Sequence, residues 1–448
     1  MPAMAQRDYI SLYKINNMKY YSLNNPNIKV SFKEAAITGI AQDKGLYFPE
    51  SIPQLDASFI ANIENYSDNE IAYRAIAPFI GNEIPEDKLR QIVQETLSFP
   101  FPLVEVEKDV FALELFHGPT MAFKDVGARF MSRCLNYFTK DDANKKITIL
   151  VATSGDTGGA VASGFLGVEG IDVVILYPSG KVSDVQEKQL TTLGQNITAL
   201  EVQGTFDDCQ DMVKKAFLDD ALKDMRLTSA NSINIARWLP QMFYYFFAYK
   251  ALKAKGKPLS VAVPSGNFGN ICAGMMAHKI GLPIGHFIAA TNANDTVPRY
   301  MHTQQYTPQQ TIETLSNAMD VSNPSNFVRI LELFHNEFGA LDKEFSTYSF
   351  TDEQTIATLK KLYNENGYLA DPHGAVGYLG LKRYLSTNRD FTGVFLETAH
   401  PVKFADSITN NLNIEIAIPE QIKAVMTGEK RTIAVDSYEG LKDFLLGR

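Results

Sequence analysis

Apolar residues gather in short, unbroken runs from residue 147 to residue 398. Continuous runs are typical of strands buried on both faces, as in parallel sheets covered by helices. Segments with helical spacing of apolar residues alternate with them. The runs cover 147–153, 173–177, 197–202, 260–264, 286–291 and 393–398, and the helical segments cover 125–138, 207–218 and 271–281. This pattern predicts an α/β fold that binds ligands at the carboxyl ends of its strands.

Before residue 104 the pattern of apolar and polar residues is different and indicates polar loops and short helices. Residues 86–97 show helical spacing of apolar side chains, and Phe99-Pro-Phe-Pro102 then breaks the pattern. We therefore expect an N-terminal domain at 18–103. Residues 1–17 are interpreted as a polar extension, with Met18 as a candidate natural start.

Composition and charge narrow the possible classes of protein. The chain has 448 residues, of which 45% are hydrophobic and 21% charged, as in soluble globular proteins. Its formal net charge is −9 and it has no long basic run, so we expect no nucleic-acid partner. An acidic chain also repels anionic membranes. The most apolar stretch, 233–252, is interrupted by Arg237, Pro240 and Gln241, and no membrane span is expected.

The number and spacing of the cysteines indicate a reducing cellular compartment. Cys134, Cys209 and Cys272 are far apart, which fits neither a disulfide framework nor a zinc site, and no metal is expected. No signal peptide is recognisable at the N-terminus. We therefore expect a cytoplasmic protein.

Two glycine-rich turns follow predicted strands and precede helices. They are Ser154-Gly-Asp-Thr-Gly-Gly159 and Ser265-Gly-Asn-Phe-Gly-Asn270. Such turns let the backbone approach a ligand, and the helix N-terminus offers free N–H groups to an anion. One turn alone is equally well explained as an ordinary feature of α/β proteins. Two together predict two anionic groups, although neither is a Walker A or GxGxxG motif.

Three further segments carry candidate chemistry. Lys124, in HGPTMAFKD, lies at the start of a packed helix, where desolvation would lower the pKa of its amine as a Schiff-base lysine requires, although most lysines are merely solvated. Arg237, in NSINIAR, suits a phosphate or carboxylate; the alternative is a surface loop. Thr398 follows the last strand, where it would face a ligand or cap a helix.

Taken together and in order, the motifs resemble those of one family, the threonine synthases of bacterial and fungal type. The resemblance begins at MKYYSLNNPNIKVSF and extends almost to the C-terminus. It includes GLYFPE, LFHGPTMAFKD, ATSGDTGGA, NSINIAR, VPSGNFGN, ATNANDTVPR, LSNAMDVSNPSN and TAHPVKF. These enzymes use pyridoxal 5'-phosphate (PLP) and have fold type II, which resembles the tryptophan synthase β-subunit.

The resemblance implies an architecture. We expect two open, twisted, mostly parallel sheets flanked by helices, plus the N-terminal domain. A large PLP-binding domain would comprise residues 104–145 and 246–448, and a small substrate-binding domain would comprise residues 146–245.

The resemblance also implies roles for individual residues. Lys124 would be the Schiff-base lysine, and Thr398 would face the pyridine nitrogen. The cofactor phosphate would lie on Gly266, Asn267, Phe268, Gly269 and Asn270. The substrate carboxylate would contact Thr153, Ser154, Asp156 and Thr157, and the substrate phosphate would contact Asn231, Ser232 and Arg237.

Asp156 departs from the wider fold class, which often has Asn at this position, against the phenolic oxygen of the cofactor. An ionised carboxylate beside an oxyanion is repulsive, so we expect one of the two to hold a proton.

The implied reaction is γ-elimination of phosphate from O-phospho-L-homoserine followed by β-addition of water, which gives L-threonine. A related PLP-dependent phospho-lyase and a serine or threonine dehydratase are the nearest alternatives, and a non-catalytic binder of phosphorylated ligands is a further one. Either a monomer or a homodimer is expected.

Overall fold

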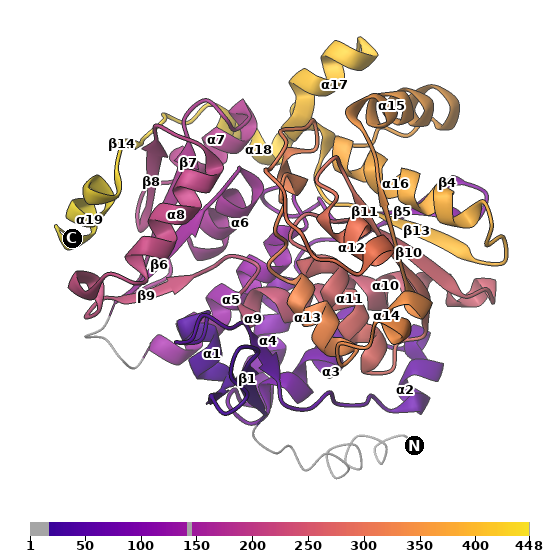
Figure 1. The fold of residues 1–448 in the computed structure, drawn as a ribbon, viewed down its shortest axis with the longest axis horizontal. Helices are drawn as coiled ribbons and strands as arrows, with labels where there is room; N and C mark the ends of the chain where they lie inside the picture. The colour runs from indigo at the N-terminus through magenta and orange to yellow at the C-terminus, as the bar shows by residue number, and fades with distance from the viewer. Residues whose placement is uncertain (1–17, 141–145, 448) are drawn as a thin grey trace.

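Two sheets of mostly parallel strands organise the protein, and helices cover their faces (Figure 1). The computed structural model describes residues 18–140 and 146–447; the expected extension at 1–17 lies outside them. The predicted fold class is confirmed. Within these described ranges, no helix has the length and apolar character needed to cross a bilayer.

The larger sheet has six strands and, with its helices, forms what we call the large lobe. Its order is β12(Phe345–Ser349), β11(Ile284–Thr291), β10(Leu259–Pro264), β13(Thr392–Glu397), β5(Val110–Glu114) and β4(Leu103–Glu107). All neighbours are parallel except β4 and β5. Val394 and Leu396 of β13 face one core, whereas Phe395 faces another. Burial on both faces explains the continuous apolar runs.

The smaller sheet has five parallel strands and forms the small lobe. Its order is β14(Ile433–Val435), β8(Ile197–Val202), β7(Ile171–Pro178), β6(Ile147–Ala152) and β9(Arg226–Ser229). Four of these strands lie within 146–245, the segment expected to form the small domain. The fifth, β14, lies within 246–448, which was expected in the large domain. Val435 of β14 and Leu441 of α19(Tyr438–Leu446) join the same core as Leu200 of β8, and this burial holds the C-terminal segment on the small lobe.

The N-terminal part is a small antiparallel sheet with several helices. β1(Lys19–Ser22) pairs with β2(Lys29–Ser31) and β3(Tyr47–Pro49). The helix α1(Phe32–Thr38) lies between β2 and β3, and α3(Asp68–Ile80) and α4(Glu86–Thr96) follow β3. These helices contact α5(Lys124–Thr139) and α10(Phe243–Leu252). Figure 1 shows this part beneath both lobes. It therefore braces the helices that lead into the region between the sheets.

The helices that matter most for a site begin where parallel strands end. α6(Asp156–Phe165) follows β6, α11(Gly269–Lys279) follows β10, and the short helix η6(Pro401–Phe404) follows β13. α16(Pro372–Leu385) packs on the large sheet, and α7(Asp184–Thr191) packs against α6. Turns from both lobes therefore meet at the carboxyl edges of the sheets, as the sequence pattern predicts.

Candidate active site

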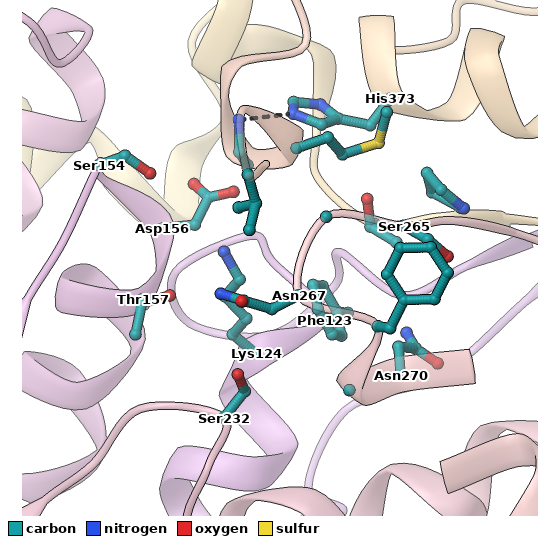
Figure 2. A pocket seen from close by; sticks show the side chains of 18 of the residues that line it. Phe123, Lys124, Ser154, Asp156, Thr157, Ser232, Ser265, Asn267, Asn270 and His373 are labelled. Atoms are coloured by element: carbon teal, nitrogen blue, oxygen red, sulfur yellow. Dashed lines mark hydrogen bonds between the residues drawn. The ribbon is translucent and has the colours of Figure 1, made fainter. Parts of the chain in front are cut away.

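One cavity between the lobes brings together every residue that the sequence analysis named for a site (Figure 2). The cavity is lined by Lys124, Thr153, Ser154, Asp156, Thr157, Asn231, Ser232, Arg237, Gly266, Asn267, Phe268, Gly269, Asn270 and Thr398. In Figure 2, Ser154, Asp156 and Thr157 lie on one side of Lys124, and Asn267 and Asn270 lie toward the other. Residues from four separate segments thus converge on one amine.

Lys124 opens helix α5 and extends its side chain into the cavity. Burial lowers the pKa of its amine to about 8; Asp156 opposes this shift, whereas Lys403 and Arg237 add to it. About a tenth of the amine is therefore uncharged at pH 7, far more than for an exposed lysine, and the uncharged form is the one that a nucleophile or base requires.

The backbone before Lys124 is held against the end of β13. The N–H of Phe123 donates to the carbonyl of Thr398 over 2.9 Å, and Ala122 and Ala399 form an isolated antiparallel bridge. These contacts place Thr398 and Lys124 in the same cavity although they are far apart in sequence. The capping alternative for Thr398 does not apply, because His400 accepts from the N–H of Val402 and caps η6.

The turn that follows β10 has the form of an anion cradle. A Cβ at Gly266 would lie 2.8 Å from the Cα of Met319 and 2.9 Å from the carbonyl oxygen of Ala318, so only glycine fits. Phe268 adopts a left-handed conformation (φ 59°) directly before α11. Tyr245 donates to Oδ1 of Asn270 over 2.8 Å, while Nδ2 of Asn270 is buried without a partner among the described residues. This free donor and the helix N-terminus fit a phosphate.

The turn that follows β6 is shaped by Thr153. Its hydroxyl oxygen accepts from the N–H groups of Gly155 and Gly158, each over 2.9 Å, so it fixes the turn. Gly155 has a φ of 133°, and a Cβ there would overlap the side chain of Gln186. In Figure 2 the hydroxyl groups of Ser154 and Thr157 point toward the cavity. Ser154 precedes helix α6, and Thr157 lies in its first turn. The turn thus presents hydroxyls and a helix N-terminus together.

Asp156 pairs with a lysine that the sequence analysis did not single out. The Nζ atom of Lys403 lies 2.7 Å from Oδ1 of Asp156, and Nε2 of Gln186 donates to the same oxygen over 2.9 Å. Burial alone would raise the pKa of Asp156, but Lys403 and then Lys124 override it and hold this pKa well below its usual range. Lys403 thus supplies the positive charge that compensates Asp156 inside the protein. Lys403 lies in the TAHPVKF motif, but nothing in its local sequence indicates complete burial.

Arg237 supplies a buried positive charge beside the cavity. Its side chain is 3% exposed, one Nη donates to the carbonyl of Ala230, and Nε has no partner among the described residues. Burial lowers the pKa of the guanidinium to about 10, so it stays charged at neutral pH. The amide of Asn231 is already engaged, since it donates to the carbonyl of Ala152 over 3.2 Å. The site therefore offers the guanidinium, more than this amide, to an anion.

Arg329 is a second buried arginine that sequence reasoning missed. It donates to the carbonyl of Ile233 over 2.6 Å and to that of Tyr47 over 2.9 Å, and it lies over the ring of Trp238. Asn326 accepts from Arg329 over 2.8 Å, and its own backbone N–H donates to the carbonyl of Asn267 over 3.2 Å. Arg329 and Asn326 thus tie the 231–237 loop to the cradle.

A buried chain of titratable groups supports the far wall of the cavity. His373 bonds to Asp371 through Nδ1 over 2.5 Å and accepts from the N–H of Ala318 through Nε2 over 3.2 Å (Figure 2). Burial, and then the neighbouring Asp371, raises the pKa of Glu397 well above its usual range. Because Ala318 lies beside Gly266, these side chains hold in place the 316–321 segment, which packs against the cradle.

Comparison with known proteins defines the class. Residues 96–392 match the family model described as "Pyridoxal-phosphate dependent enzyme", which accords with the lysine and phosphate cradle in one cavity. Residues 19–97 match the model "Threonine synthase N terminus", and residues 374–445 match "Threonine synthase, C-terminal". The prediction of a PLP enzyme is confirmed.

Individual relatives narrow the class to a family. The chain is 47% identical over 410 residues to a threonine synthase of Haemophilus influenzae, covering 90% of this chain and 94% of that one. The crystal structure of threonine synthase from Escherichia coli superposes with a TM-score of 0.90 at 43% identity, covering 96% of this chain and 100% of that one. PLP-bound threonine synthase from Brucella melitensis also superposes with a TM-score of 0.90, at 36% identity, covering 96% and 98%. The chain belongs to the threonine synthase family.

Proposed function

We propose that the substrate is O-phospho-L-homoserine, which the protein converts with water into L-threonine and inorganic phosphate in the cytoplasm. One observation carries this proposal: two separate anion-binding loops, Gly266–Asn270 and Asn231–Arg237, open into the same cavity as the amine of Lys124. One loop accounts for the phosphate of a cofactor. The other calls for a substrate that carries a phosphate of its own.

The residues present fit the cofactor. Lys124 would hold the aldehyde carbon of PLP, the loop Gly266–Asn270 would hold its phosphate, and Thr398 would face the pyridine nitrogen. When bound, PLP supplies an electron sink for negative charge on the substrate carbons. A neutral hydroxyl at position 398, in place of a carboxylate, would leave the pyridine nitrogen largely unprotonated.

The substrate carboxylate is assigned to the turn after β6. Ser154 and Thr157 provide hydroxyl donors, and the N-terminus of α6 provides backbone N–H groups. Thr153 holds the turn in shape, and Asp156 keeps its carboxylate on Lys403. Binding of the carboxylate here would fix the substrate amine and Cα beside Lys124.

The substrate phosphate is assigned to Arg237 and Ser232. A buried guanidinium at the cavity wall provides strong, directional bonds to a phosphate, both in the substrate and after it has left. This interaction offsets the negative charge that grows as the bond from Cγ to oxygen breaks. The same charge helps to keep the released phosphate in the cavity while water adds at Cβ.

Lys124 is the base that this geometry supports for the proton transfers. With a pKa of about 8, its amine can accept the proton from Cα and, once that proton has been passed on, the proton from Cβ. It can return protons at Cγ and Cα, while the remaining proton of the added water goes to the released phosphate. The buried position of the amine limits access of stray water, which would divert the reaction to a keto acid.

A product assay tests the proposal. The purified protein with PLP and O-phospho-L-homoserine should release phosphate and L-threonine in equal amounts, and Lys124→Ala should release neither above background. Phosphate accompanied by a keto acid instead of threonine would indicate a dehydratase-like enzyme. No reaction with this substrate would reject the proposed function.

A further inference from the structure

A buried network of polar side chains joins the two lobes beside the cavity, and Lys403 lies at its centre. Lys403 belongs to η6 of the large lobe and is completely buried, whereas Asp156 opens α6 of the small lobe. The Nζ atom of Lys403 donates to Oδ1 of Asp156 over 2.7 Å and to the carbonyl of Thr120 over 2.8 Å. From α7, Nε2 of Gln189 donates to the same carbonyl over 3.1 Å. Thr120 belongs to the loop that leads into Lys124.

Positive groups outnumber negative groups around the amine of Lys124. Lys124, Lys403 and Arg237 contribute three positive groups, and Asp156 is the carboxylate that interacts with both lysines. Asp125, next in sequence, accepts from the backbone N–H and the hydroxyl of Thr120, and it also interacts with the charges of Lys403 and Arg237. The two lysines therefore compete for Asp156.

Two further titratable groups line the cavity but are engaged elsewhere. Asp320 accepts from Thr314 over 2.7 Å and from Asn292 over 2.8 Å. His373 is bonded to Asp371. Neither of these groups relieves the competition for Asp156.

The hydrogen bonds show that Lys403, and not Lys124, pairs with the carboxylate of Asp156. Oδ1 of Asp156 accepts from Lys403 and from Gln186, and within the described chain no hydrogen bond joins it to Lys124. Thr120 fixes the Lys403 amine from the opposite side. We propose that Lys403 is a positioning residue that holds Asp156 across the lobes and so prevents this carboxylate from pairing with the amine of Lys124.

The inference assigns Lys403 no contact with the substrate. Lys403 is absent from the residues that line the cavity in the described chain, so it acts through Asp156. The electrostatics agree, because Asp156 raises the pKa of Lys124 and Lys403 lowers it. A lysine that loses its counterion to a neighbour keeps more of its amine uncharged, which is the form that attacks an aldehyde. The inference thus rests on the proposed role of Lys124.

The test measures the reactivity of Lys124 without turnover. Full-length protein freed of PLP is labelled with acetic anhydride at a series of pH values, and acetylation of Lys124 is quantified by peptide mass spectrometry. Lys403→Met should free Asp156 to pair with Lys124, so labelling of Lys124 at pH 7 should fall roughly three- to tenfold. Lys403→Arg keeps the charge and should label like the wild type.

A double-mutant cycle separates positioning from simple repulsion between lysines. In an Asp156→Asn background, Lys403→Met has no carboxylate to release, so it should slow labelling clearly less than in the wild type. The combined variant also leaves neither partner of the pair charged and buried, which favours folding. Should Lys403→Met alone not fold, Lys403→Gln replaces it in the cycle.

A control and the opposing results complete the test. Lys430→Met removes a lysine that pairs with Glu187 of α7 over 2.8 Å, away from the cavity, and should leave labelling of Lys124 unchanged. Unchanged labelling in Lys403→Met, or equal slowing in both backgrounds, would overturn the inference. Because the assay needs no substrate, this result is independent of whether the proposed reaction occurs.

Discussion

At the scale of single residues, the site depends on charged groups that are buried with few or no opposite charges. Arg237 is the clearest case, since its guanidinium is buried and its Nε lacks a partner among the described residues. Burial of an unpaired charge is costly, and a ligand anion would offset that cost. Glu397 illustrates a second case, because burial and the neighbouring Asp371 raise the pKa of its carboxyl group and so favour its neutral form.

Replacement of Arg237 should separate substrate binding from cofactor binding. Arg237→Ala is expected to lower kcat/KM for O-phospho-L-homoserine by roughly a hundredfold or more, because a charge-assisted bond to the phosphate is lost. The affinity for PLP, measured by absorbance titration, should change by less than about twofold. Arg237→Lys keeps the positive charge but loses the planar guanidinium group, so its kcat/KM should lie between those of the wild type and of Arg237→Ala. Equal losses in both measurements would indicate a purely structural role.

Replacement of Glu397 should change how stability depends on pH. The pKa of Glu397 is raised in the folded protein, so over a range above its unfolded value the native state holds one proton more than the unfolded chain. Stability therefore decreases as pH rises through this range, by about 1.4 kcal/mol per pH unit. Glu397→Gln should remove this contribution to the slope above the ordinary pKa of a glutamate, as measured by urea unfolding at a series of pH values. Glu365→Gln, at an exposed position of α15(Asp352–Asn366), is the control, and an unchanged slope in Glu397→Gln would contradict the assignment.

At the scale of elements, turns after parallel strands create the site, and their backbone geometry matters as much as their side chains. Gly266 illustrates this, because the backbone of the 316–321 segment fills the space where a Cβ would be. The neighbouring wall is itself fixed by His373, which bonds the N–H of Ala318. The cradle and the segment over it therefore form one rigid unit.

A methyl group at position 266 should disturb this unit. Gly266→Ala is expected to weaken PLP binding roughly tenfold or more, because its Cβ would contact backbone atoms of Ala318 and Met319 that cannot rotate away. Gly339→Ala, in α14(Phe338–Glu344), is the matched control, since a Cβ there meets nothing within 4 Å. Equal PLP affinities in the two variants would show that the cradle tolerates the methyl group.

The elements also show what the sequence could and could not predict. Two strands in the middle of a sheet, β6 and β10, were predicted to within a residue or two because both faces are buried and nearly every side chain is apolar. The strand β5, which pairs with β13 and β4, was nevertheless missed. Edge strands such as β12 and β14 carry mixed residues and were missed. Turns after predicted strands led to the candidate site, whereas Lys403 and Arg329 were missed because the burial of a charged side chain depends on distant segments.

At the scale of the whole molecule, the chain crosses between the lobes several times. The N-terminal part contacts Arg329 through the carbonyl of Tyr47, and the C-terminal segment returns to complete the small sheet with β14 and α19. Leu441 of α19 is fully buried in the core of the small lobe, whereas Leu446 of the same helix is 54% exposed. The small lobe thus depends on residues 433–446, which are far in sequence from its other strands.

Truncation of one side chain in α19 should test this dependence. Leu441→Ala is expected to destabilise the protein by about 2–5 kcal/mol through loss of buried contacts. Leu446→Ala should change stability by no more than about 0.5 kcal/mol. Denaturant unfolding followed by circular dichroism measures both. Similar stability in the two variants would show that α19 adds little to the small lobe.

The late arrival of β14 has a consequence for synthesis on the ribosome. Strands β6 to β9 are made long before residues 433–435, so the edge of β8 that β14 covers has no partner while translation continues. An uncovered strand edge invites pairing with other nascent chains. Termination before residue 433 would therefore be expected to cause aggregation, even though every residue that lines the cavity has already been made.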